Sequence, residues 1–139
     1  MPGDEGERTR NARRAYEAFR RSGADGILQF LDPEVEWRAW SKFAREPKVV
    51  HGHAGVKGLF AVYEENFDEL RAEPLEFIEV GDDLLVVPFL LTGRQKGTDD
   101  RMEIELVHVW KTDGERASRL DVYDSKDEAL KAVGLNETD

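Results

Sequence analysis

The chain has 139 residues, a formal net charge of -10 and no cysteine. This length predicts one domain with a substantial core, and 40% hydrophobic with 36% charged residues indicates a globular chain. The acidic charge argues against nucleic acid and anionic membranes as partners, because their phosphates would be repelled. The lack of cysteine excludes disulfides, thiolate metal sites and cysteine nucleophiles. No apolar run is long enough to span a membrane and the N-terminus has no signal-peptide core, so we expect a cytoplasmic protein.

Helices dominate the predicted N-terminal half. Apolar residues recur at helical spacing over residues 5–22 and again over residues 54–68. Between them, a short helix is predicted at residues 25–31 and a first strand at residues 34–40, where apolar and polar residues alternate. We expect residues 41–50 to form a loop.

Strands dominate the rest of the chain. The pattern predicts strands over residues 75–80, 84–91, 101–110 and 117–123, and Ser125 is placed to cap a short final helix. Helices and strands are therefore largely segregated, which predicts an α+β fold. We expect three N-terminal helices to cover one face of a curved antiparallel sheet. Apolar residues on the other face predict a second subunit there, and hence a homodimer.

A carboxylate in the middle of a strand, Asp121, is the first candidate functional residue. Strands are depleted in aspartate. The Asp-Gly pair at residues 113–114 predicts a two-residue hairpin turn, which places Leu106 opposite Asp121. His108 then lies diagonal to Asp121, about 7 Å away on the same face. A bulge in this hairpin would reverse that facing.

The face predicted to carry Asp121 mixes apolar and polar side chains. Its other members are Ile104, Leu106, His108, Trp110, Ala117, Arg119 and Tyr123. An apolar surface with a few convergent polar groups is typical of a small-molecule site. The alternative is a cross-strand ion pair between Arg119 and Asp121 at a wet end of the sheet.

Four segments together resemble the SnoaL-like branch of the nuclear transport factor 2-like superfamily. They are LDPEVEWRA (31–39), VHGHAGVKGLF (50–60), HVWKTDGE (108–115) and LDVYDSKDEALKAVGL (120–135). The resemblance runs from about Thr9 to Leu135 and implies a single SnoaL-like domain over residues 1–139. It further implies a cone-shaped fold with a deep apolar pocket, a homodimer, and chemistry that needs no metal or organic cofactor. The superfamily includes polyketide cyclases, ketosteroid isomerases, limonene-epoxide hydrolases, dehydratases and non-catalytic binding domains, so the fold alone does not choose a function.

The resemblance assigns a role to Asp121. The segment DVYD (121–124) resembles the one that holds the general acid/base carboxylate of the epoxide hydrolases, and the pocket aspartate of the polyketide cyclases falls at the same position. Tyr16 is the candidate match for the tyrosine oxyanion donor of the ketosteroid isomerases. The hydrolases' other charged groups fall near residues 86–90, and the isomerases' base falls near residues 38–39, where this sequence has no carboxylate.

We therefore expect an apolar or aromatic small molecule as the ligand, and cyclase or isomerase chemistry with Asp121 as general acid/base. His108 and Tyr16 would support it. The other residues expected to bind the ligand are Trp37, Phe60, Tyr63, Phe89, Leu106, Trp110, Arg119 and Tyr123. A non-catalytic ligand-binding or dimerisation module and an epoxide hydrolase-like activity remain alternatives. The HGH segment (51–53) has ligand-like spacing, but its place at a predicted helix start favours a capping or pocket-rim role, so we expect no metal site.

Overall fold

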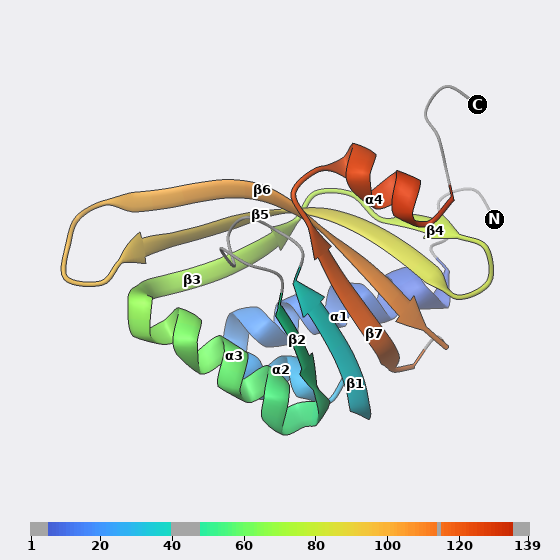
Figure 1. The fold of residues 1–139 in the computed structure, drawn as a ribbon, viewed down its shortest axis with the longest axis horizontal. Coiled ribbons are helices and arrows are strands. Elements are labelled where there is room, and N and C mark those ends of the chain that lie inside the picture. Colours follow the sequence, from blue (N-terminus) through green and yellow to red (C-terminus); the bar gives the residue numbers. More distant parts are fainter. Residues whose placement is uncertain (1–5, 40–47, 114, 135–139) are drawn as a thin grey trace.

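The computed structural model describes residues 6–39, 48–113 and 115–134. Its strands form one curved sheet, with α1 and α2 behind it and α4 on the opposite side (Figure 1). The elements are, in chain order, α1 (Glu7–Ser22), α2 (Ala24–Leu28), β1 (Leu31–Ala39), β2 (Lys48–His51), α3 (Gly52–Asn66), β3 (Phe67–Pro74), β4 (Ile78–Val80), β5 (Leu84–Gln95), β6 (Arg101–Thr112), β7 (Ala117–Tyr123) and α4 (Lys126–Ala132). No helix in these described ranges is long and apolar enough to cross a membrane.

The predicted helices are confirmed, and two strands were missed. Residues 48–51 form β2 rather than part of a loop, while residues 40–47 lie outside the described residues. The helix predicted over residues 54–68 ends at Asn66, and β3 follows at once. Both missed strands lie at the ends of the sheet, where solvent-exposed charged residues weaken the alternation that marks a strand.

The α+β class is confirmed, but the sheet is mixed rather than wholly antiparallel. Its strand order is β2-β1-β7-β6-β5-β3, with β4 also paired to β5. The pair formed by β1 and β7 is parallel and places Arg38 beside Asp121. These two strands are distant in sequence, so no local turn signal could have revealed how they pair.

The core has two parts, one on each face of the sheet. The larger part lies between the inner face and α1, α2 and α3. The smaller part lies on the outer face, where Val86, Val107 and Val109 pack with Ala129 and Leu130 of α4. Helix α4 begins where predicted, since the Ser125 side chain accepts a hydrogen bond from the Glu128 N–H. The chain's own last helix therefore covers part of the apolar outer face that we had assigned to a second subunit.

The register of β6 with β7 differs from the predicted one. Val109 lies opposite Asp121 and His108 lies opposite Val122, so the predicted pairing of Leu106 with Asp121 is wrong. Two irregularities cause the change. The Asp113 side chain accepts hydrogen bonds from the N–H groups of Glu115 and Arg116, which opens the expected two-residue turn into a longer loop. The ladder also shifts next to Thr112, and the odd offset reverses which face each side chain occupies.

Candidate functional site

A cavity of about 360 Å³ lies between the inner face of the sheet and helices α1 to α3. Strands β5 and β6 supply its floor with side chains spaced two residues apart, as the strand period requires. The predicted pocket residues that do line it are Tyr16, Trp37, Phe60, Tyr63, Phe89, Leu106 and His108. An apolar, largely aromatic wall of this kind suits an apolar or aromatic ligand.

The imidazole of His108 is the polar group on the floor of the cavity. Its side chain comes from β6, in the middle of the sheet, and the residue is only 6% exposed. Its ring stacks on Phe89 with the ring centres 3.9 Å apart, and the Trp37 ring meets it edge-on at 5.8 Å. These aromatic neighbours fix the plane in which the imidazole presents its two nitrogens.

Tyr16, on α1, joins His108 to Trp110. The Tyr16 hydroxyl lies 2.7 Å from His108 Nδ1 and accepts a hydrogen bond from Trp110 Nε1 at 3.1 Å. Trp110, which we expected to bind the ligand, does not line the cavity itself; it contacts Tyr16, which does. The three side chains come from α1 and β6, so this cluster ties a helix to the sheet at the base of the pocket.

Burial determines the charge state of this cluster. Desolvation lowers the pKa of His108 to about 3, because the protonated ring would lose its hydration. Desolvation also raises the pKa of Tyr16, and the hydrogen bond from Trp110 opposes this effect without outweighing it. Both groups are therefore neutral at pH 7, and the cluster acts through hydrogen bonds rather than through charge.

Acidic side chains line the cavity only where it meets solvent. They lie around the junction of α3 and β3 and are Glu64, Asp68 and Glu69. Asp68 lies 3.5 Å from Arg94, and Glu69 lies 3.8 Å from Arg101. The backbone of Glu69 has a φ of 56°, at the point where the β3–β5 ladder shifts. Because all three carboxylates reach solvent, and two of them lie near arginines, they form a polar rim, and His108 is the polar group on the floor.

Asp121 lies on the other face of the sheet, away from the cavity. Its Oδ1 accepts a hydrogen bond from Arg38 Nε at 2.5 Å, and its Oδ2 accepts one from Arg38 Nη2 at 3.1 Å. Arg119 adds an ion contact at 3.3 Å. The expected position of Asp121 beside His108 in the pocket is therefore wrong. Asp121 does form ion pairs, as the alternative proposed, but its cross-strand partner is Arg38 of β1, because Arg119 lies on the same strand β7. The Asp121 side chain is also buried, at 3% exposure, rather than at a wet end of the sheet.

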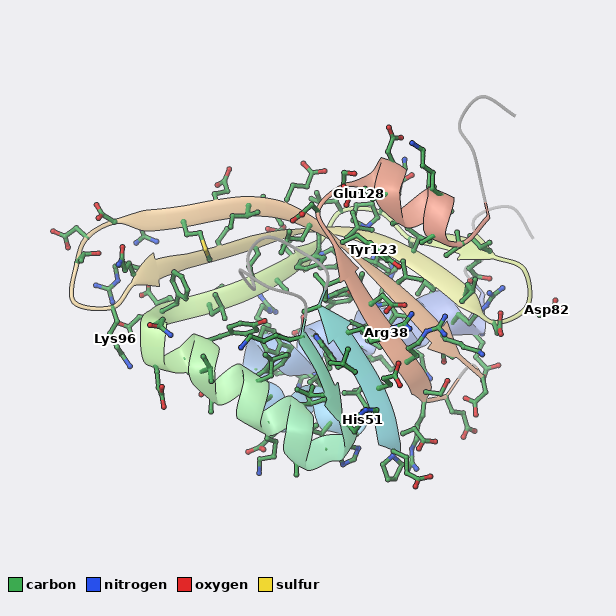
Figure 2. All side chains as sticks on the ribbon, in the orientation of Figure 1. Arg38, His51, Asp82, Lys96, Tyr123 and Glu128 are labelled. Atoms are coloured by element: carbon green, nitrogen blue, oxygen red, sulfur yellow. The ribbon has the colours of Figure 1, made fainter. Side chains whose placement is uncertain are left out.

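Two more residues expected in the pocket lie outside its lining. Arg119 and Tyr123 share the outer face with Asp121, because the three are spaced two residues apart on β7. Figure 2 labels Arg38 and Tyr123, which come from the neighbouring strands β1 and β7. Burial raises the pKa of Tyr123, and the Asp121 charge adds to that effect.

The HGH segment (residues 51–53) lies at the start of α3. His51 is the N-cap residue of this helix, and Gly52 has a φ of 72°, a conformation that favours glycine. His53 Nε2 lies 2.9 Å from the carbonyl oxygen of Leu31 and can donate to it. This geometry agrees with a structural role for the segment at the predicted helix start.

A family model described as the SnoaL-like domain matches residues 12–120, which is more than half of the chain. The chain belongs to the SnoaL-like family. This membership agrees with the predicted resemblance, and with a curved sheet whose inner face carries the pocket.

Solved structures share the SnoaL-like fold over nearly the whole chain. A protein of unknown function with the nuclear transport factor 2-like fold, from Burkholderia pseudomallei, is 25% identical, with a TM-score of 0.75 over 94% of this chain and 99% of that one. TerC, co-crystallised with polyporic acid, is 24% identical, with a TM-score of 0.74 over 91% and 97% of the two chains. A protein from Catenulispora acidiphila with a ketosteroid isomerase-like fold, in complex with trimethylamine, is 14% identical, with a TM-score of 0.70 over 89% and 92%. No curated protein matches the chain.

The sequence reasoning missed part of the pocket. The lining also includes Phe19, Ile27, Phe67, Leu70 and Leu91. Phe19 and Ile27 were identifiable as apolar helix positions, but only the packing of α1 and α2 against the sheet places them at a cavity. Phe67 and Leu70 were hidden because β3 had no clear strand signal.

Proposed function

We propose that this SnoaL-like protein binds an apolar or aromatic small molecule in the cavity under α1 to α3. The proposal depends on one observation, an apolar cavity of about 360 Å³ with an imidazole on its floor. A site of this size suits a compact ligand of one to a few fused rings. TerC, co-crystallised with polyporic acid, offers one organic probe for this pocket, and the relative with trimethylamine offers another.

A ligand screen with a blocked pocket tests this proposal. Ala72 lines the cavity from β3, so Ala72→Phe would place a ring in the ligand space. Ala61 lies exposed on α3 and is absent from the cavity wall, so Ala61→Phe is the matched control. A ligand that raises the melting temperature of the wild type and of Ala61→Phe, but not of Ala72→Phe, would support the site. Equal shifts in all three proteins would refute binding in this cavity.

A second candidate is cofactor-independent isomerase or cyclase chemistry in the same cavity. The observation that favours it is the neutral imidazole at the cavity floor, which can polarise a ligand carbonyl and so acidify the adjacent carbon. Water from the solvent would accept the proton from that carbon and return one to it. The test is deuterium exchange at the carbon next to the carbonyl of 1-tetralone, followed by proton NMR in deuterated buffer. Exchange faster than in buffer that disappears in His108→Gln supports this chemistry. If the ketone binds but exchanges only at the rate seen in buffer, the protein binds this ligand without catalysing the exchange.

The geometry gives less support to the other activities considered. Asp121 is held by two arginines on the outer face, so we propose no acid/base role for it in this pocket. Among the described residues, the carboxylates that line the cavity belong to the partly exposed rim, and they do not form the buried charged set of an epoxide hydrolase. An assay for diol formation from a panel of epoxides would test this alternative.

The homodimer and the cytoplasmic location stay predictions. The outer face of β1 and β7 carries the Arg38, Asp121 and Arg119 cluster and is the surface on which we place a second copy of the chain. Light scattering after size exclusion measures the mass directly. A mass near 15.9 kDa at all concentrations would exclude the dimer.

A further inference from the structure

We propose that Trp110, Tyr16 and His108 form a hydrogen-bond chain with one direction, which presents the Nε2–H of His108 to the cavity as a donor. The site would therefore select apolar ligands that carry an oxygen acceptor, such as an aromatic ketone. This inference deepens the proposed function, because it rests on the cavity being a ligand site.

The direction of the chain begins at Trp110. An indole nitrogen carries a hydrogen and has no lone pair to accept with, so Trp110 Nε1 can only donate to the Tyr16 oxygen, at 3.1 Å. The phenol has one hydrogen of its own and uses an oxygen lone pair for this contact. Its remaining close contact, at 2.7 Å, is with His108 Nδ1.

The phenol hydrogen then decides the histidine tautomer. If Tyr16 donates to Nδ1, every polar hydrogen of the phenol and the indole is satisfied, and the imidazole hydrogen must sit on Nε2. If Nδ1 donates instead, the Tyr16 oxygen accepts twice and its own hydrogen has no partner among the described residues. Leaving a buried hydroxyl hydrogen unpaired is costly. The short distance of 2.7 Å also suits a hydroxyl donor better than a ring N–H, whose usual distance is about 2.9 Å.

Among the described residues, the one hydrogen-bond partner of the His108 ring is Tyr16 at Nδ1, and His108 lines the cavity. The ring cannot readily turn away, because Phe89 stacks on it at 3.9 Å and Trp37 meets it edge-on. A fixed N–H in an apolar wall penalises a pure hydrocarbon ligand, which would bury the donor without a partner. An oxygen acceptor at that point removes the penalty, and the neutral ring adds no preference for a full negative charge.

Nitrogen-15 NMR of the ligand-free protein tests the chain directly. Long-range proton–nitrogen spectra at pH 7 distinguish a protonated ring nitrogen from a bare one. We expect His108 with a protonated Nε2 and a bare Nδ1 in the wild type. Tyr123→Phe, which removes a hydroxyl on the outer face of the sheet, should leave that pattern unchanged, whereas Tyr16→Phe should give a mixture of tautomers. A wild-type His108 protonated on Nδ1 would overturn the chain.

Ligand selectivity is tested with two matched pairs, 1-tetralone against tetralin and 9-fluorenone against fluorene. We expect each ketone to bind the wild type and Tyr123→Phe about 10-fold more tightly than its hydrocarbon, the worth of one net hydrogen bond. In His108→Leu the two members of each pair should bind equally. Equal affinity already in the wild type would overturn the selectivity while leaving the pocket as a ligand site. If other apolar probes bind and neither pair does, the selectivity is also wrong. If no probe binds at all, the proposed function is wrong, and the NMR measurement of the His108 tautomer becomes the test of the hydrogen-bond chain.

Discussion

Replacing Asp121 by asparagine removes the negative charge that holds Arg38 and Arg119 together on the outer face. Arg38 donates two hydrogen bonds to this carboxylate, and Arg119 lies 3.3 Å from it. An amide keeps the shape but offers one acceptor atom, and it leaves two guanidinium groups on neighbouring strands without their counter-charge. The same contact explains why the pKa of Arg38 is raised, chiefly by its hydrogen bond to Asp121.

The size of the effect follows from burial. Removing one member of a buried ion pair costs about 3–5 kcal/mol. The Asp121 side chain is 3% exposed, but those of Arg38 and Arg119 are 28% and 36% exposed, so water partly screens what remains. We expect the free energy of unfolding to fall by about 2–3 kcal/mol. For a chain of this length, that corresponds to a melting temperature lower by about 10 °C.

Urea unfolding and a pocket-ligand titration on the same variant test this reasoning. Glu103→Gln is the control, because Glu103 is an exposed carboxylate on the same face of the sheet and its loss should cost less than about 0.5 kcal/mol. The expected result for Asp121→Asn is lower stability with ligand affinity retained below the unfolding transition. Unchanged stability of Asp121→Asn would refute the structural role of this carboxylate.

Two further predictions concern His108 and the glycines of the helices. The pKa of His108 is about 3 in the fold and about 6.5 when unfolded, so the unfolded chain alone takes up this proton as the pH falls from about 6.5 to 3. The contribution of His108 to the free energy of unfolding is therefore at its maximum above pH 6.5 and falls by up to about 1.4 kcal/mol per pH unit below it. Urea titrations at several pH values should show this slope in the wild type and not in His108→Gln. Gly26→Ala should lower the melting temperature, because its Cβ would collide with the Ala18 carbonyl oxygen. Gly58 has open space around it, so Gly58→Ala should raise the melting temperature, because alanine's higher helix propensity adds about 1 kcal/mol to the free energy of unfolding. Equal shifts for the two alanine variants would contradict the packing of α2 on α1.

Local patterns predicted most of the elements, because a single face of each element is buried. The stripe that contains Ala12, Ala15 and Tyr16 predicted α1, and all three residues are buried. The alternation over residues 101–110 predicted β6 and placed His108 and Leu106 on one face, which is confirmed by the cavity lining. The missed strand β3 has a weaker alternation, with charged residues on its exposed side.

The site was predicted in part, and its central carboxylate was placed wrongly. His108 and Tyr16 are both at the cavity, but their contact joins residues 92 positions apart and no spacing rule foretells it. The predicted position of Asp121 assumed a two-residue Asp-Gly turn between β6 and β7. The loop is longer than that and the ladder shifts next to Thr112, so the register differs from the predicted one. Because side chains alternate along a strand, an odd shift moved Asp121, Arg119 and Tyr123 to the other face together.

The sequence alone determined the α+β class, the family resemblance and the aromatic character of the pocket, since these depend on composition and local periodicity. Only the tertiary structure decided which face each strand residue occupies, that β1 runs parallel to β7, and that α4 covers part of the outer face. These outcomes depend on pairings between distant segments and on hydrogen bonds of single turn residues. For that reason the candidate site is centred on His108 and Tyr16, while Asp121 lies with the arginines on the opposite face.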